Sequence, residues 1–376
     1  MRSDLPVHRA CLAEIDVEIA EVEQRLAKLR SRRAAIKGLL DAYKYPVLTL
    51  PNEIVSEIFF HASPPVALWE PQAPFESPLL LTHVCSKWRQ MVFSMPLLWS
   101  TFRLAFTPND MRPSADRQIA LAYNWLKRSG SCPLSLDIQH AMEMDTRYPA
   151  LQSFYSDLGE HSVHCGHLTI TGSFTAAEMV TPLLSGSMPL LRSLHFNFGR
   201  LSQPIVLGDA PLLRTVTLGG RARSRVTLPW AQLTSLTLLE GILPRFIPML
   251  QQARNLVHCE LNVFLNPQHG QVAPDLHFPR MESLTIKAVV GGNPHLDIRI
   301  LECFVTPALR RLVVPDFNLG NDPFDTLSSF FAKSSCTLDS LCLTYDERQA
   351  RARNITVADY RLAFPTISSI SLRHQD

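Results

Sequence analysis

Four side chains that can bind a transition metal lie within seven residues of one another. His161, His164, Cys165 and His167 supply three imidazoles and a thiol, which are donor types that Zn²⁺ prefers. Four ligands this close together can surround a tetrahedral ion only where the chain turns sharply. Residues 165–170 instead resemble the entry into a strand, so we expect no metal site here and no cofactor.

The sequence lacks the other common motifs of enzyme chemistry. It has no Gly-x-Ser-x-Gly elbow, no Gly-rich phosphate loop and no His-Glu-x-x-His. Gly219–Gly220 and Gly291–Gly292 follow predicted strands and are typical of turns. A basic loop holds Arg221, Arg223 and Arg225, and it is either solvated or able to bind an acidic or phosphorylated partner. We therefore predict a binding protein and not an enzyme, with a hidden hydrolase as the least favoured alternative.

One short apolar pattern recurs eight times between Met188 and Leu372. Each copy has an apolar residue, two variable residues, a second apolar residue, one variable residue and a third apolar residue. The central positions are Leu194, Val216, Leu236, Cys259, Leu284, Leu312, Leu341 and Ile370. Their spacing of 20 to 29 residues is the period of leucine-rich repeats, in which each copy contributes one strand.

Less regular copies precede these eight. Residues 100–106 alternate as a strand does, as do Leu134, Leu136 and Ile138, and then Leu168 and Ile170. Residues 119–128 have the spacing of a helix. The predicted fold class is therefore α/β, with a leucine-rich-repeat solenoid of parallel strands over residues 100–376.

The residues between the apolar positions of each copy face away from the core. Most of them are serine, threonine or another polar residue, which leaves room for the side chains of a ligand. The larger polar residues at these positions are the predicted substrate-binding residues, namely His258, Glu260, Asn262, Lys287, Arg311 and Arg373. A sheet face that is merely solvated would have a similar composition.

Residues 1–45 predict one amphipathic helix of the coiled-coil type. The seam positions follow steps of three and four residues, and they are Leu12, Ile15, Ile19, Val22, Leu26, Leu29, Arg33, Ile36 and Leu40. Acidic residues occupy the first half of the helix and basic residues the second half. A parallel partner would therefore set like charges side by side, whereas an antiparallel partner would set acid beside base. We expect either an antiparallel homodimer or packing of this helix on its own chain.

The segment from residue 46 to residue 99 has three motifs in a fixed order. Leu50-Pro51 opens a predicted helix, Val84-Cys85-x-x-Trp88-Arg89 follows a proline-rich insert at residues 61–78, and Pro96-Leu97-Leu98-Trp99 closes the segment. Together they resemble the F-box of fungal F-box-like proteins, which carry a coiled-coil helix before the box and irregular leucine-rich repeats after it. The resemblance implies a small helical domain that binds the Skp adaptor of a cullin–RING ubiquitin ligase. The adaptor-binding residues that it implies are Leu50, Pro51, Ile54, Ile58, Val84, Cys85 and Trp88.

The composition predicts a soluble protein with a hydrophobic core, located in the cytoplasm or nucleus. Hydrophobic residues make up 46% and charged residues 19%, and no apolar run is long enough to span a membrane. The N-terminus carries charges where a secretory signal would be apolar, and the eight cysteines contain no Cys-x-x-Cys pair. A net charge of +2 gives no reason to expect nucleic acid. The predicted function is substrate recognition for a Skp–cullin–F-box ubiquitin ligase, and the alternative is a leucine-rich-repeat interaction scaffold without a ligase.

Overall fold

The computed structural model describes residues 5–42, 50–62, 76–106, 112–140, 149–172, 179–199, 203–220, 225–264, 274–289, 300–320, 322–345 and 355–374. Most of the proline-rich insert at residues 61–78, the basic loop except Arg225, and the Gly291–Gly292 turn lie outside these ranges. The chain divides into two compact units, Met1–Ala62 and Ser63–Asp376.

The first unit contains two helices, α1 (Leu5–Ala42) and α2 (Asn52–Ala62). The 38 residues of α1 confirm the predicted long helix, and every side chain described in it, from Pro6 to Ala42, is exposed. Helix α2 starts directly after Pro51, with Glu53 in its first turn, where a carboxylate is favoured by the helix dipole. Val55 and Phe59 on α2 are buried.

The described part of the second unit begins with three short helices, α3 (Glu76–Thr82), α4 (Ser86–Phe93) and the 3-10 helix η3 (Pro96–Trp99). The Arg89 side chain joins α4 to α3, because its Nε donates to the Thr82 carbonyl at 2.8 Å. Trp99 is fully buried and donates from Nε1 to the Val92 carbonyl at 2.8 Å. These contacts tie the end of the predicted box together with directed hydrogen bonds.

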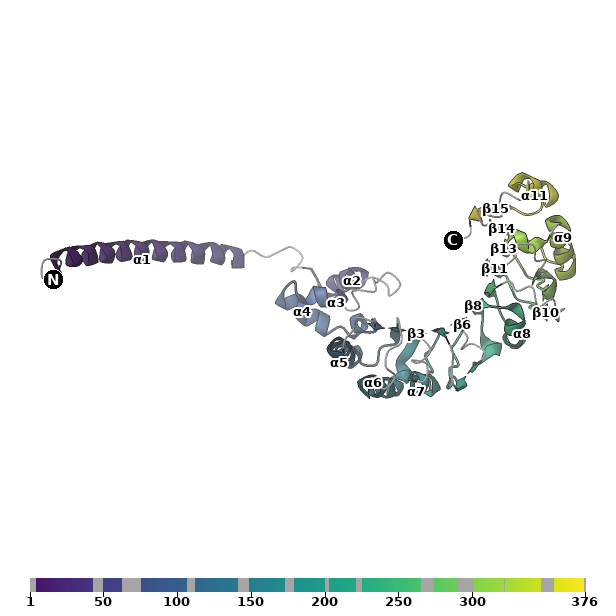
Figure 1. Ribbon diagram of the computed structural model, residues 1–376, viewed down its shortest axis with the longest axis horizontal. Helices are drawn as coiled ribbons and strands as arrows, with labels where there is room; N and C mark the ends of the chain where they lie inside the picture. The colour runs from purple at the N-terminus through teal and green to yellow at the C-terminus, as the bar shows by residue number, and fades with distance from the viewer. Residues whose placement is uncertain are drawn as a thin grey trace. The chain divides into compact units, whose positions relative to one another are not determined.

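An 11-stranded parallel sheet forms the body of the second unit (Figure 1). Its strands are β1 (Thr101–Phe106), β2 (Leu134–His140), β3 (Cys165–Gly172), β4 (Ser193–Phe198), β6 (Thr215–Gly219), β8 (Ser235–Gly241), β9 (His258–Phe264), β11 (Ser283–Val289), β13 (Arg311–Pro315), β14 (Ser340–Tyr345) and β15 (Ser369–His374). The strands lie in the sheet in the same order as in the chain. All eight repeated copies and the three earlier ones form strands, which confirms the α/β class and the parallel sheet.

The connections between strands cover one face of the sheet. They include the helices α5 (Arg112–Ser129), α6 (Pro149–Glu160), α7 (Thr181–Ser185), α8 (Leu243–Gln252), α9 (Pro323–Ser334) and α11 (Val357–Ala363). Two short parallel ribbons lie in other connections, β5 (Ile205–Val206) with β7 (Val226–Thr227) and β10 (Leu276–His277) with β12 (Phe304–Val305). In the second unit the strands follow the inner side of a bend and the larger helices its outer side (Figure 1).

The core lies between the sheet and these connections. The central apolar residues of the repeats stack in register, so that Leu284 has Cys259 and Leu312 as its Cα partners. All three are at most 2% exposed. Burial of a leucine side chain contributes about 2 kcal/mol, so this ladder of apolar contacts is the main stabilising element of the fold.

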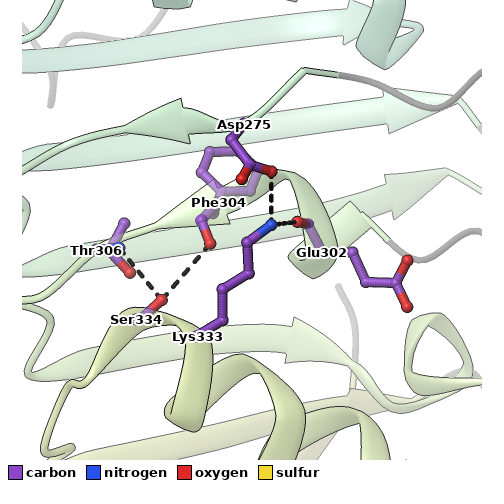
Figure 2. A network of polar contacts seen from close by, with 6 residues as sticks. All are labelled: Asp275, Glu302, Phe304, Thr306, Lys333 and Ser334. Carbon is purple, nitrogen blue, oxygen red and sulfur yellow. Dashed lines mark hydrogen bonds and ion pairs between the residues drawn. The ribbon is translucent and has the colours of Figure 1, made fainter.

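Polar contacts at the end of α9 fasten that helix to the β10–β12 ribbon (Figure 2). Lys333 donates from Nζ to Asp275 Oδ1 at 2.6 Å and to the Glu302 carbonyl at 2.5 Å, whereas the Glu302 carboxylate points away. The Ser334 hydroxyl accepts from the Thr306 N–H at 3.2 Å and lies 3.5 Å from the Phe304 carbonyl, to which it donates. The side chains at the end of α9 thus satisfy backbone groups of Glu302, Phe304 and Thr306 in and around β12, so the role of this network is structural.

Candidate functional site

The four possible metal ligands do not form a metal site. Cys165 is buried in β3, where burial raises the pKa of its thiol to about 12, and His167 is exposed on the opposite face of that strand. His161 and His164 lie at η4 (Ser162–His164), before the strand. Within the described ranges, no three His, Cys, Asp or Glu side chains come together as metal ligands.

Exposed apolar side chains of the predicted box occur in each of the two units of the chain. On α2, Ile54 and Ile58 are 49% and 41% exposed, although Val55 and Phe59 on the same helix are buried. In the second unit, Val84 lies in the turn between α3 and α4 and is 59% exposed. Large apolar side chains at this exposure mark contact surfaces when they occur in groups.

The other predicted adaptor-binding residues are less accessible or have a local role. Pro51 is exposed, whereas Leu50, Cys85 and Trp88 are half-buried. Cys85 caps the start of α4, because its Sγ accepts a hydrogen bond from the Trp88 N–H at 3.4 Å. Cys85 therefore stabilises the helix start whatever its role in binding.

Two exposed leucines of the box were missed by the sequence reasoning. Leu80 on α3 is 61% exposed and Leu97 on η3 is 53% exposed. The run Leu79-Leu80-Leu81 contains more leucines than one face of a single helical turn can bury, and that is the signal that could have identified Leu80.

A candidate surface in the second unit is the face of the sheet opposite the helices. Of the predicted substrate-binding residues, His258, Glu260 and Asn262 alternate along β9. Lys287 on β11 has Asn262 as its Cα partner, and its Nζ lies 2.8 Å from Glu260 Oε1. The carboxylate of Glu260 is thus paired, and Asn262 Oδ1 is buried without a hydrogen-bond partner among the described residues.

The remaining two predicted residues lie further along the same face. Arg311 on β13 and Arg373 on β15 are both exposed. The short strand β14 separates them, with Ser340 beside Arg311 and Thr344 beside Arg373. The structure therefore brings Glu260, Asn262 and Lys287 into one group and leaves the two arginines as a second group.

A buried ion pair at the other end of this face was not predicted. Arg103 Nε on β1 lies 2.7 Å from Asp137 Oδ2 on β2, and both side chains are less than 10% exposed. Gln139 Nε2 donates to both Asp137 oxygens at 3.2 Å. On β4, burial lowers the pKa of His195, an effect that the negative charge of Asp137 partly offsets. This polar cluster is buried at the N-terminal end of the face, whereas Arg311 and Arg373 on the C-terminal strands are exposed.

Comparisons with known proteins do not assign a function to the box residues or to the sheet face. Neither the models of known protein families nor the curated proteins gave a match to this chain. Among the described residues, no helix combines the length and the apolar character needed to cross a membrane.

Proposed function

We propose that this protein is a substrate receptor of a cullin–RING ubiquitin ligase. The box at residues 46–99 would bind the Skp adaptor, and a leucine-rich-repeat solenoid at residues 100–376 would bind the substrate. Catalysis would then come from holding the substrate close to the ligase, which needs no reactive side chain in this chain. The proposal rests on the resemblance to the F-box and on the exposed apolar side chains of that segment.

The observation that supports the proposal most is a difference in exposure between two pairs of apolar residues on α2. Burial of Val55 and Phe59 accounts for two of the apolar residues of this helix, but Ile54 and Ile58 remain exposed. A helix that only capped the repeats would gain nothing from two exposed isoleucines. Burial of these isoleucines by an adaptor would contribute roughly 2 kcal/mol each to the free energy of binding.

Binding to a purified Skp adaptor, measured by isothermal titration calorimetry, tests the proposal. The Ile54→Ala/Ile58→Ala variant is expected to lose about 2 kcal/mol or more, which is at least about a 30-fold weaker affinity. Leu50→Ala/Pro51→Ala is expected to weaken binding in the same way. Asn52→Ala/Glu57→Ala on the same helix is the matched control and should bind as the parent does. If the parent chain fails to bind the adaptor, the ligase function is wrong and the interaction scaffold without a ligase remains.

We also propose that α1 pairs with α1 of a second copy in antiparallel orientation. With Leu12 at heptad position a, the seam residues fill the a and d positions in turn. In a parallel pair, each g residue faces the e residue of the next heptad on its partner. Four facing pairs lie in α1, and three of them have a charge on both residues, namely Glu18–Glu23, Arg25–Arg30 and Arg32–Lys37. Each of these three pairs is like-charged, so repulsion destabilises the parallel arrangement; the fourth pair, Cys11–Asp16, carries a single charge.

An antiparallel pair reverses this balance. Its e positions face e positions and its g positions face g positions. When Ile15 faces Leu40 of the second copy, Ile19 faces Ile36 and Leu26 faces Leu29, so three of the seam layers are apolar. The layer between them pairs Val22 with Arg33. The flanking pairs Asp16–Lys37 and Glu23–Arg30 are then oppositely charged, and only Arg25–Arg32 is repulsive. Each pair occurs twice by symmetry. Charge therefore favours the antiparallel dimer, and the exposed apolar seam of α1 provides the area for it.

A further inference from the structure

The first row of outward side chains along the sheet consists mainly of small hydroxyl residues. This row contains one residue from each of the eleven strands, close to the start of the strand, and each residue is paired with the next across the sheet. Its members are Thr101, Ser135, His167, Ser193, Thr215, Ser235, His258, Ser283, Arg311, Ser340 and Ser369. Eight of these eleven residues are serine or threonine. A face of this kind offers hydrogen-bond donors and little apolar surface, so it suits a polar ligand and not an apolar one.

The charges on this face do not cancel. Its carboxylates are Asp137 and Glu260, and each is already held by a base, Arg103 at 2.7 Å and Lys287 at 2.8 Å. Arg311 and Arg373 remain, and neither forms an ion pair within the described parts of the chain. The nearby carboxylate of Asp339 lies at a strand start and is 3.5 Å from Arg310 Nη1. Glu282 also precedes a strand, and the alternation of β11 turns it away from this face.

The spacing of the two arginines suits an extended chain. They lie two strands apart and four residues apart along the strands, which places their Cα atoms about 16 Å from each other. Strand β14 runs between them with the small side chains of Ser340, Cys342 and Thr344. An extended peptide rises about 3.3 Å per residue, so acidic residues about four to six positions apart would reach both guanidinium groups.

We infer that the surface formed by Arg311, Arg373 and the outward side chains of β14 binds an extended acidic segment of a partner protein. Each guanidinium can hold a carboxylate or a phosphate with two parallel hydrogen bonds. The Ser340 hydroxyl beside Arg311 can donate to the peptide. The inference deepens the proposed function and rests on it, because the partner would be the ligase substrate. Aspartate, glutamate and phosphoserine share the required chemistry.

The test uses fluorescence anisotropy of the full chain with three labelled ten-residue probes. One probe alternates glutamate and serine, the second carries phosphoserine at the serine positions, and the third replaces each glutamate by glutamine. We expect both anionic probes to bind and the glutamine probe to bind at least about 10-fold more weakly, with affinity falling as salt is raised. A phosphoserine probe that binds much more tightly than the glutamate probe would identify phosphorylation as the source of charge.

The Arg311→Glu/Arg373→Glu variant carries the decisive measurement. It is expected to bind the anionic probes at least about 10-fold more weakly than the parent, a change that corresponds to about 1.4 kcal/mol. Arg280→Glu/Arg361→Glu makes the same change in net charge at two exposed arginines off the face, and it should bind as the parent does. Equal losses in both variants, equal binding of the glutamine probe, or no binding of either anionic probe up to ~1 mM would overturn the inference.

Adaptor binding by the same variants separates this inference from the proposed function. Arg311 and Arg373 lie outside the box, so both variants should bind the Skp adaptor as the parent does. If the parent fails to bind the adaptor but binds acidic probes through these arginines, the acidic-peptide site stands and only the ligase function fails. If the adaptor binds and the probes do not, the ligase function stands and the acidic-peptide site is wrong.

Discussion

Helix α1 and the large sheet both contain regularly spaced apolar residues, but these side chains are exposed in α1 and buried in the sheet. In α1, Leu12 and Val22 are 64% and 65% exposed. In the sheet, Leu194 and Leu284 are at most 1% exposed. Each strand pairs with strands of the neighbouring repeats in the same chain, whereas none of the described residues covers the apolar residues of α1. An apolar period therefore identifies which residues share a face, and a separate observation must identify what covers that face.

The largest expected effect is the loss of a core leucine in the sheet. Leu312→Ala should lower the free energy of unfolding of the sheet by about 2–5 kcal/mol, because it leaves a cavity between two fully packed neighbours. Val313→Thr, one residue along and half-buried on the outward face, should cost less than about 1 kcal/mol. Denaturant unfolding followed by circular dichroism would measure both. Equal costs would show that the two faces are not as different as their burial indicates.

Acid should destabilise the sheet through a buried histidine. His140 on β2 is buried, its Nε2 is hydrogen-bonded to the Tyr155 hydroxyl, and burial lowers its pKa to about 4. The unfolded chain, with a histidine pKa near 6.5, binds the proton first as the pH falls. Stability from this group is thus fully present above about pH 6.5 and is lost by about pH 4, with a total of about 3 kcal/mol.

Unfolding curves of the parent and of His140→Gln between pH 4 and 7 check this expectation. The variant lacks the titrating group, so its stability should change less over that interval. A parent and variant with parallel pH profiles would show that His140 titrates normally in the folded sheet.

Charges on the outward face should matter little for stability. Lys287→Glu/Arg311→Glu removes an exposed ion pair of a kind that contributes about 0–1 kcal/mol. The variant is expected to stay within about 1 kcal/mol of the parent while it loses capture of a substrate identified by proximity labelling. Unfolding of the variant would show that these residues support the sheet. Retained capture by a folded variant would place the substrate elsewhere, with the loop at residues 221–225 as the next choice.

The smallest effect on the sheet should come from α1, which instead controls the oligomeric state. Removal of residues 1–42 is expected to convert a dimer to a monomer in sedimentation, with no change in the unfolding of the sheet. In a Cys11→Ser background, Ile19→Cys alone should not cross-link, because Ile19 faces Ile36 of the second copy. Ile19→Cys with Ile36→Cys should form a disulfide between residues 19 and 36 of different chains. Cross-linking by the single variant would demonstrate a parallel pair, and a monomeric parent would favour packing of α1 on its own chain.

The eleven strands could be predicted from the sequence because their signal is local and repeated. Leu191, Leu194 and Phe196 need only the alternation of a strand to be placed in the core, and all are at most 1% exposed. The pair formed by Arg103 and Asp137 could not be predicted in the same way. The two residues are 34 positions apart, and their contact depends on the register between β1 and β2. The Lys333–Asp275 pair, 58 positions apart, is a second example.

The candidate surfaces were predictable only in part. Alternation placed Lys287 and Arg311 on the outward face correctly, but it gave no sign that Lys287 is paired with Glu260. The pairing requires two side chains on adjacent strands to have opposite charge and the right length, and neither condition has a periodic signal. In the box, the exposure of Leu80 was not predicted because the residue type alone does not determine whether a leucine is buried or exposed.

The strands lie in the sheet in the same order as in the chain, and this affects how such a protein can change during evolution. Every strand of the sheet pairs only with the strands before and after it in the chain. Duplication of one strand with its connection would therefore insert a new element between two old ones and leave every other pairing intact. Each such event would lengthen the outward face by about 4.8 Å, the distance between neighbouring strands. A gene that duplicates in units of 20 to 29 codons can enlarge or shift its recognition surface without redesign of the existing core.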